Sequence, residues 1–183
     1  MCCDKTSIVS DNLRMKNINQ TVLTSEPASQ LSKLQCRWHA LVDMDSVLLY
    51  DLLALRVAVF VVEQRCIYQE LDGLDASSMH YIVKDSDQVV ACLRVIPPAE
   101  NESRFRIGRV AVSSQWRKHG IARMMLLKAI QKLRFDDPAC VIFLDAQTYL
   151  LDFYQSLGFS IDGDEFLEDG IPHTPMQYTG LSQ

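Results

Sequence analysis

The chain has 183 residues, of which 48% are hydrophobic and 22% charged, and its formal net charge is −5. This length favours one domain with a sizeable core, and the acidic balance argues against a nucleic-acid-binding protein, which needs a strongly basic field. No apolar run reaches the length of a membrane helix and no signal peptide is evident, so we expect a cytoplasmic protein with no membrane partner. No two cysteines have C-x-x-C spacing, so we expect no metal site.

The beginning of the chain differs in composition from the rest. Residues 1–33 are rich in Ser, Thr, Asn and Gln without sustained periodicity, which is typical of a flexible segment. We therefore expect a flexible leader over 1–33 and one folded domain over 34–183. That domain opens with an expected strand in LQCRWHALV (34–42). The next run, SVLLYDLLALRVAVF (46–60), predicts an amphipathic helix with Ser46 as its N-cap.

The middle of the chain alternates between strand and turn patterns. Two runs rich in β-branched residues, 79–85 and 88–96, flank a polar Asp-Ser-Asp turn and predict a hairpin. FRIGRVAV (105–112) predicts another strand. After Gly120, apolar residues recur at helical spacing, which predicts a long amphipathic helix.

The last third of the chain predicts further strands around one helix. CVIFLDA (140–146) is a continuous apolar run, typical of a strand covered on both faces. The helix expected over 149–157 has Thr148 as its N-cap and ends at Gly158. GFSI and TPMQY predict a final pair of strands around an acidic loop (162–173). This order of elements predicts a single mixed α/β domain.

Positively charged residues stand where the long helix begins. Arg117, Lys118 and His119 precede Gly120. The first turn of a helix has unpaired N–H groups and a partial positive charge, both of which favour an anion. Gly120 lacks the Cβ that would hold a phosphate away from the backbone. The segment predicts an anion site, and the alternative is a solvated basic turn. Its spacing matches neither the dinucleotide fingerprint nor a Walker A loop.

This segment, together with three others, resembles a known superfamily. Arg117-x-x-Gly120-x-Ala122 after a strand resembles the acyl-CoA signature of the GNAT superfamily of N-acetyltransferases. More narrowly, four blocks in the right order resemble the ElaA-like branch: LRVAVFVVEQRCIYQELDG (55–73), IGRVAVS (107–113), FYQSLGF (153–159) and LEDGIPH (167–173).

The resemblance implies a fold and has two departures. A GNAT fold has a mixed central sheet, here expected to contain about six to seven strands, with helices on both faces. Ile67 stands where the ElaA-like branch often has proline, and Tyr149 stands where it often has histidine. Both departures concern the acceptor pocket rather than the fold.

The resemblance also implies acetyl-CoA as the cosubstrate. In this superfamily the thioester lies between two splayed central strands, the pantetheine pairs with the backbone of the strand before the signature, and the pyrophosphate rests at the helix start. The implied binding residues are Val110, Ala111, Val112, Arg117, Lys118, His119, Gly120, Ile121, Ala122, Gln147 and Tyr154.

Two catalytic roles follow from the same resemblance. Tyr154 matches the family tyrosine near the departing sulfur and is the expected general acid, because a phenol stays protonated at pH 7. It would equally suit a core aromatic. Glu63, Asp72, His80 and Asp145 are candidates for a general base. Glu63 is preferred, because its block would flank the acceptor site.

The acceptor site is expected to contain charged residues of both signs. Its expected members are Glu63, Asp72, His80, Arg94, Arg109 and His173. Arg94 and Arg109 lie within apolar strands, where an unpaired charge is costly. They would either bind an acidic group of the acceptor, such as the phosphate of glucosamine 6-phosphate, or pair with internal carboxylates such as Asp72 or Asp75. His173 would line the site or fix a loop.

The implied activity is acetyl transfer to a primary amine by direct attack in a ternary complex. The acceptor would be a small amine, an amino-sugar phosphate or a protein amino group. The expected partners are acetyl-CoA and this acceptor, and the chain could form a homodimer. Two alternatives stay open. Acylhomoserine lactone synthases carry a similar LR..VF helix followed by acidic residues, and a non-catalytic acyl-CoA-binding regulatory module would keep the fold.

Overall fold

A computed structural model describes residues 31–65, 68–100 and 102–180. Most of the predicted leader (1–33) and the departure at residue 67 lie outside these ranges. The elements follow in the order β1 (Gln35–Ala40), η1 (Leu41–Asp43), α2 (Ser46–Arg56), η2 (Val57–Glu63), η3 (Leu74–Ser77), β2 (Met79–Asp85), β3 (Gln88–Ile96), β4 (Arg104–Val112), η4 (Ser114–Trp116), α3 (Ile121–Asp136), β5 (Val141–Gln147), η5 (Thr148–Leu150), α4 (Leu151–Gln155), β6 (Phe159–Ile161), β7 (Phe166–Glu168) and β8 (Ile171–Tyr178).

One mixed sheet organises the domain. Its strand order is β1-β2-β3-β4-β5-β8-β6, and β7 also pairs with β8. Every neighbouring pair is antiparallel except β4 and β5, which run parallel. The described residues thus form eight strands, one more than the upper end of the prediction. The predicted β2–β3 hairpin and the final β6–β8 pair are both confirmed.

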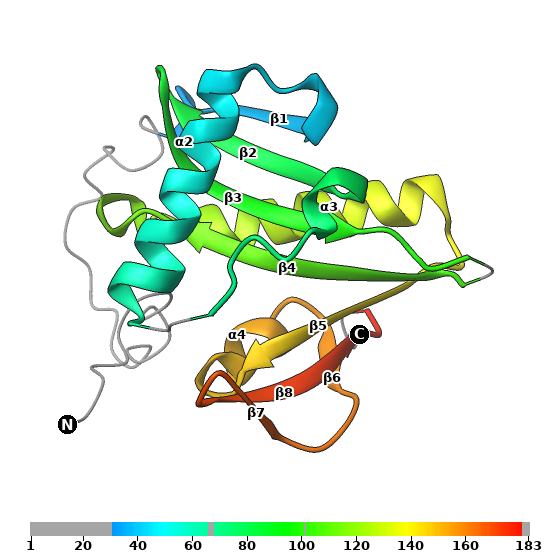
Figure 1. Cartoon of the computed structure of the whole chain (residues 1–183). Helices are drawn as coiled ribbons and strands as arrows, with labels where there is room; N and C mark the ends of the chain where they lie inside the picture. The colour runs from blue at the N-terminus through cyan, green and yellow to red at the C-terminus, as the bar shows by residue number, and fades with distance from the viewer. Residues whose placement is uncertain (1–30, 66–67, 101, 181–183) are drawn as a thin grey trace, which may run out of the picture.

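Helices cover both faces of the sheet, as the predicted fold requires (Figure 1). Side chains alternate between the two faces along a strand. In β2, Ile82 packs with Leu52 of α2, whereas Val83 packs on the other side with Met125 and Leu126 of α3. This alternation produces two apolar layers, each between the sheet and a helix.

Two helix starts differ from the prediction. The N-cap of α2 is Asp45 rather than Ser46, because the Asp45 Oδ1 accepts hydrogen bonds from the N–H groups of Val47 and Leu48 at 2.9 and 2.8 Å. Both residue types are good caps, and the shift is one position.

Thr148 does not cap the helix that follows it. Its Oγ1 lies 3.0 Å from the Oγ1 of Thr174 on β8, and residues 148–150 form a tighter turn before α4 begins at Leu151. The helix also ends at Gln155, before the predicted stop at Gly158, whose φ of +95° instead belongs to the turn that leads into β6.

Strand β5 is covered more on one face than the other, so the prediction of full cover on both faces is wrong. Ile142, Leu144 and Ala146 are buried, while the intervening side chains are only partly buried. The partly buried face includes Asp145 and Gln147, which line a cavity. The open face of β5 therefore belongs to the site rather than to the core.

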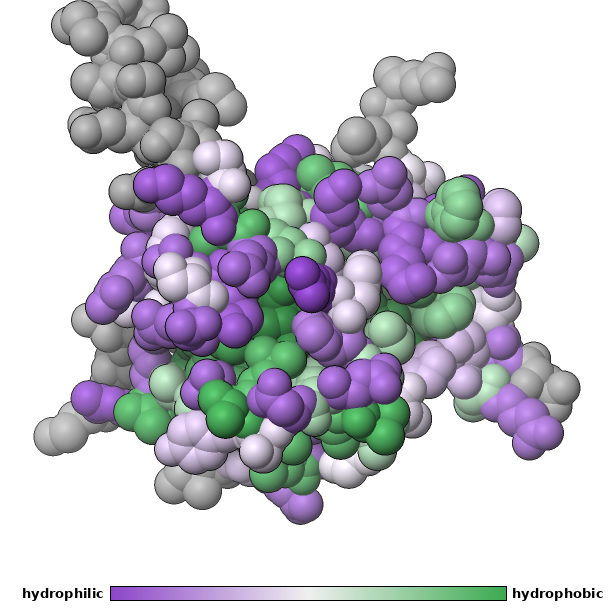
Figure 2. All heavy atoms as spheres, turned by 90° about the horizontal axis from the view of Figure 1, so that it is seen from above, coloured by the Kyte–Doolittle hydropathy of each residue, from purple (hydrophilic) through white to green (hydrophobic). Residues whose placement is uncertain are grey.

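The surface seen from above the β1 edge has apolar area in its middle and polar side chains around it (Figure 2). Exposed large apolar side chains in this part of the chain include Val42, Val47 and Tyr50. No helix within the described ranges is long and apolar enough to cross a membrane.

Candidate active site

The two central strands separate after a short contact. Strands β4 and β5 pair only from Arg104 opposite Val141 to Arg106 opposite Phe143. Beyond this point β4 stays with β3 and β5 stays with β8, so the two strands diverge toward their C-terminal ends (Figure 1). Backbone groups on the facing edges are left without a ladder partner, and such groups need another hydrogen-bonding partner.

A β-bulge changes the direction of the β4 side chains at the point where β4 and β5 separate. Cys92 pairs with Ala111 and Arg94 pairs with Gly108, so β4 carries one more residue than β3 between these pairs. Arg109 has a φ of +51° at this point. A bulge interrupts the alternation of side chains, and the consecutive residues Arg109 and Val110 both line the same cavity.

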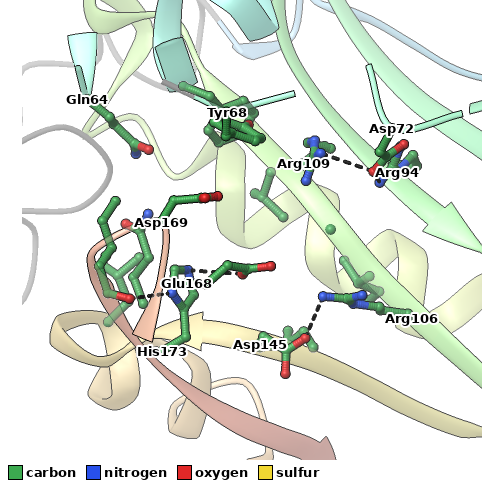
Figure 3. A pocket seen from close by; sticks show the side chains of 18 of the residues that line it. Gln64, Tyr68, Asp72, Arg94, Arg106, Arg109, Asp145, Glu168, Asp169 and His173 are labelled. Atoms are coloured by element: carbon green, nitrogen blue, oxygen red, sulfur yellow. Dashed lines mark hydrogen bonds and ion pairs between the residues drawn. The ribbon is translucent and has the colours of Figure 1, made fainter. Parts of the chain in front are cut away.

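The cavity between the diverging strands has a volume of about 310 Å³. Aromatic, apolar and charged side chains from five parts of the chain surround it (Figure 3). Of the predicted site residues it is lined by Asp72, Arg94, Arg109, Val110, Asp145, Gln147, Tyr154 and His173. The predicted residues that do not line it are Glu63, His80, Ala111, Val112, Arg117, Lys118, His119, Gly120, Ile121 and Ala122.

A network of buried ion pairs lies next to the cavity. Arg56, almost fully buried, donates to both carboxylate oxygens of Glu70 at 2.7 and 2.6 Å and to Asp75 at 2.7 Å. Burial works against the charge of Arg56, but these hydrogen bonds outweigh it and hold its pKa above the ordinary value. Sequence reasoning did not single out Arg56, Glu70 or this role for the α2 helix.

The arginines predicted for the acceptor site belong to this network. Arg94 donates to both oxygens of Asp72 at 2.7 and 2.6 Å and to Asp75 at 2.9 Å. Arg109 donates to Asp72 at 3.0 Å, lies 3.2 Å from Glu70, and its guanidinium carbon sits 5.4 Å from the Tyr68 ring centroid. The interpretation in which Arg94 and Arg109 pair with internal carboxylates is confirmed.

Two candidates for the general base lie away from the cavity. His80 is buried, and its Nε2 lies 3.2 Å from the carbonyl oxygen of Asp75. Burial lowers the pKa of His80. It therefore has a structural position behind the ion network, and the geometry does not support it as an acceptor-binding residue.

Glu63 is engaged with a residue of the predicted donor site. Its two carboxylate oxygens each accept a hydrogen bond from Arg117 at 2.7 Å, and the Arg117 Nε donates to the Val112 carbonyl at 3.1 Å. Glu63 is at the end of η2 and does not line the cavity between β4 and β5. This geometry does not support Glu63 as the base or as an acceptor contact.

The start of α3 retains the features of an anion site. Gly120 has a φ of +76° and Lys118 a φ of +66°, so the chain turns sharply before the helix. The first helical hydrogen bond runs from the Met124 N–H to the Gly120 carbonyl at 3.0 Å, which leaves the preceding N–H groups without helical partners. A Cβ at Gly120 would meet no atom within 4 Å. Ile121 itself points into the core.

The other donor-site predictions divide between core and surface. The side chains of Ala111 and Val112 are buried in the two apolar layers, so only their backbone is available. His119 lies beside Trp116, with ring centroids 6.0 Å apart. Its Nδ1 is buried without a hydrogen-bond partner among the residues described. Gln147 accepts a hydrogen bond from the Tyr149 hydroxyl at 2.6 Å.

Tyr154 lies both in an aromatic cluster and at the cavity. Only 7% of it is exposed, and its ring has edge contacts with Phe153 and Phe159 at centroid distances of 5.2 and 6.0 Å. It also lines the cavity. Burial, with a smaller contribution from Tyr149, raises the pKa of Tyr154 above its ordinary value. The phenol therefore keeps its proton at neutral pH.

A short hairpin forms the opposite wall of the cavity. Asp169 and Gly170, with φ of +51° and +79°, connect β7 to β8, which is the conformation that an Asp-Gly hairpin turn adopts. Glu168 and His173 extend from this hairpin toward the cavity (Figure 3). The sequence analysis treated the segment as a loop, and its Asp-Gly pair was the signal that could have predicted β7.

One further ion pair crosses the opening between the strands. Arg106 of β4 donates to Asp145 of β5 at 2.6 Å (Figure 3). Asp145, a candidate base, is thus occupied by a cation at the point where the strands part. Arg106 was not predicted as a site residue.

Among the described residues, no group of three His, Cys, Asp or Glu side chains is placed to hold a metal ion.

Comparisons with known proteins agree with this architecture. The acetyltransferase (GNAT) domain model matches residues 48–180. A UPF0039 protein of Mycobacterium tuberculosis is 46% identical over 145 residues, covering 77% of this chain and 90% of the relative. Protein ElaA of Escherichia coli is 38% identical over 130 residues, covering 70% of this chain and 85% of the relative.

Solved structures give the same assignment. The crystal structure of an acyl-CoA N-acyltransferase from Pseudomonas aeruginosa is 36% identical with a TM-score of 0.76, covering 80% of this chain and 99% of that one. The crystal structure of Escherichia coli ElaA is 34% identical with a TM-score of 0.74, covering 79% and 98% of the two chains. The chain therefore belongs to the GNAT acetyltransferase family, in its ElaA-like branch.

Proposed function

We propose that this protein is an acetyl-CoA-dependent N-acetyltransferase that acts on a primary amine carrying no phosphate or other anionic group. The observation that carries the proposal is the opening between β4 and β5, which exposes unpaired backbone edges on both sides of a cavity containing a buried, protonated Tyr154. An extended, largely neutral chain such as pantetheine can pair with such an edge, and the adjacent start of α3 suits its phosphates.

The residues present support direct transfer. A neutral amine attacks the thioester carbonyl, the carbon–sulfur bond breaks, and the Tyr154 hydroxyl gives its proton to the departing sulfur. Holding both reactants in one cavity contributes through proximity. The bulged strand at Arg109 and Val110 offers N–H groups near the opening, the kind of donor that stabilises a developing oxyanion.

The charge balance of the cavity argues for the class of acceptor. Three arginines, Arg56, Arg94 and Arg109, face three carboxylates, those of Glu70, Asp72 and Asp75. The network is therefore neutral as a unit and has no guanidinium left for a phosphate. Arg106 is likewise matched by Asp145.

The charged residues of the cavity that lie outside these arginine–carboxylate pairs are negative. Within the described residues, no arginine or lysine pairs with Glu168 or Asp169, and both line the cavity. A cationic amine is attracted to such a wall and an amino-sugar phosphate is repelled. Of the acceptors suggested by the sequence, we therefore propose small amines and protein amino groups in preference to glucosamine 6-phosphate.

The test is thiol release from acetyl-CoA with a panel that contains 1,4-diaminobutane, glucosamine, glucosamine 6-phosphate, lysine peptides and hydroxylamine. We expect turnover with cationic amines, and kcat/KM for glucosamine 6-phosphate at least about tenfold below that for glucosamine, the matched sugar without the charge. A gain on adding the phosphate would contradict the acceptor class. CoA binding by calorimetry without thiol release from any acceptor would instead favour the regulatory module.

A further inference from the structure

Acyl transfer from an ammonium substrate needs a proton acceptor near the amine, because the protonated nitrogen has no lone pair for attack. Glu63 and His80 do not line the cavity, and Asp145 is held by Arg106. The cavity wall opposite the ion network still contains one nitrogen base, His173. It is 9% exposed and comes from the β7–β8 hairpin.

The hairpin fixes the ring of His173 in one orientation. The His173 Nδ1 lies 2.9 Å from the carbonyl oxygen of Ile171, and a carbonyl can only accept, so Nδ1 carries the proton and donates it. In the neutral ring Nε2 then has the lone pair. The Phe166 ring stacks on the imidazole with a centroid distance of 6.0 Å and an interplanar angle of 30°, which restricts rotation about the side-chain bonds.

Register places a carboxylate beside the free nitrogen. Phe166 lies opposite His173, and Glu168 lies opposite Ile171, so all four side chains share one face of the hairpin. Glu168 is the diagonal neighbour of His173 across the strands, and its Oε2 lies 3.9 Å from the Nε2 (Figure 3). This separation leaves room for an approaching ammonium to contact both groups, and the carboxylate stabilises an imidazolium once it forms.

We propose that His173 is the general base that takes a proton from the ammonium form of the acceptor, with Glu168 as the residue that stabilises the resulting cation; this rests on the acyl transfer proposed above. The Nε2 accepts one proton and the amine lone pair forms the carbon–nitrogen bond. The carbon–sulfur electron pair leaves with sulfur, which receives the Tyr154 proton. The nitrogen loses its second proton as the amide forms, which replaces the proton that Tyr154 gave.

The charged and titratable groups around the ring come from every neighbouring element. Those that line the cavity with His173 are Glu168 and Asp169 of the hairpin, Asp145 of β5, Arg106 and Arg109 of β4, Arg94 of β3, Tyr154 of α4, and Tyr68 and Asp72 of the segment before β2. All three arginines are paired with carboxylates, so none adds an unpaired positive charge to the cavity. The proton then passes from His173 to solvent at the partly open hairpin.

The experiment compares two nucleophiles in the variant His173→Asn, whose amide keeps a donor for the Ile171 carbonyl but cannot accept a proton. For the alkyl primary amine of the panel that the wild type turns over fastest, protonated at pH 7.5 because such amines have a pKa of about 10, we expect kcat/KM to fall about 10²- to 10³-fold. For hydroxylamine, which is already unprotonated, we expect a loss of less than about threefold.

Three comparisons complete the test. The alkyl-amine deficit of His173→Asn should shrink as pH rises toward the pKa of the amine. Glu168→Gln should lower kcat/KM for the alkyl amine about tenfold, and Glu165→Gln, an exposed neighbour outside the cavity, should change nothing. CoA affinity, measured by calorimetry, should stay at the wild-type value in all three variants.

The outcomes separate the two proposals. Equal losses on both nucleophiles, at every pH, would overturn the role of His173 as a base and assign it to the structure of the hairpin. Unchanged kinetics in His173→Asn would overturn it as well. Absence of thiol release by the wild type with every acceptor, hydroxylamine included, would overturn the acyltransferase proposal itself and the role of His173 with it.

Discussion

At the scale of single residues, Tyr154 is the side chain on which the proposed chemistry depends. It lies in the aromatic cluster with Phe153 and Phe159 and also lines the cavity. The ring has a fixed position because of these contacts, and burial raises the pKa of the hydroxyl. A fixed, protonated phenol can donate to a departing thiolate without first being reorganised.

Replacing Tyr154 by Phe should therefore remove the proton donor and leave the packing intact. We expect kcat to fall by about 10²-fold, while the affinity for CoA in calorimetry and the midpoint of urea unfolding stay close to the wild-type values. Tyr149→Phe, at a more exposed position, is the control and should alter kcat far less. Unchanged thiol release by Tyr154→Phe across the pH range would refute the acid role.

Sequence reasoning was most successful where a residue's chemistry alone constrains its surroundings. Arginines inside apolar strands must pair, and Arg94 and Arg109 do. Glu63 illustrates the opposite case. Its partner Arg117 lies 54 positions away in the chain, and nothing in the local pattern of either residue predicts that they meet. The choice of base therefore required the three-dimensional arrangement.

At the scale of elements, the start of α3 is the proposed site for the phosphates of CoA. Its free N–H groups and the open space in front of Gly120 suit a phosphate. Gly120→Glu should raise the Kd for CoA by about 100-fold and Gly120→Gln by about tenfold, because the first adds both bulk and negative charge and the second only bulk.

A matched glycine separates ligand repulsion from backbone strain. Gly180 has a φ of +92° and equally open surroundings, so Gly180→Glu should cost about as much stability as Gly120→Glu, about 1–2 kcal/mol for a side chain at positive φ. The Kd of the Gly180→Glu variant for CoA should stay at the wild-type value. Equal effects of the two variants on CoA binding would place the phosphates elsewhere.

Long elements with a regular apolar pattern were the easiest to predict from the sequence. The long α3 and the β2–β3 hairpin follow from 3.6- and 2-residue patterns. The three residues of strand β7 are all exposed, so no alternation of apolar and polar positions indicates a strand, and the Asp169-Gly170 turn is the local signal for it. The start of α2 was misplaced by one position because Asp45 and Ser46 are both good caps.

At the scale of the whole molecule, the ion network connects α2, the segment from Glu70 to Asp75, and strands β3 and β4. Arg56 is the centre of this arrangement. In the sequence it is one arginine in an amphipathic helix, where exposure to solvent is the usual expectation. Its partners Glu70 and Asp75 follow 14 and 19 residues later, in a stretch without periodicity, so the sequence could not reveal the pairing.

Arg56→Met keeps much of the side-chain volume and removes the charge, which leaves two buried carboxylates without their main partner. We expect a loss of about 3–5 kcal/mol in the free energy of unfolding at pH 7, measured by urea denaturation. Lys132→Met, which breaks the exposed pair with Asp136, is the control and should cost less than about 1 kcal/mol. Equal losses in the two variants would mean that the buried network does not hold these elements together.

The loss of unfolding free energy in Arg56→Met should also depend on pH. Burial alone would raise the pKa of Asp75, but the hydrogen bonds and charges of Arg56 and Arg94 together outweigh it, and the pKa is lowered. In the wild type this carboxylate therefore stabilises the fold above the unfolded-state pKa of about 3.9, and the contribution is lost as pH falls below that value. Without Arg56 only Arg94 still opposes burial, so the folded-state pKa of Asp75 is higher in the variant than in the wild type and its carboxylate contributes less stability at pH 7. The difference between the two proteins therefore shrinks on acidification, and a difference that grows from pH 7 to pH 4 would contradict this account of the network.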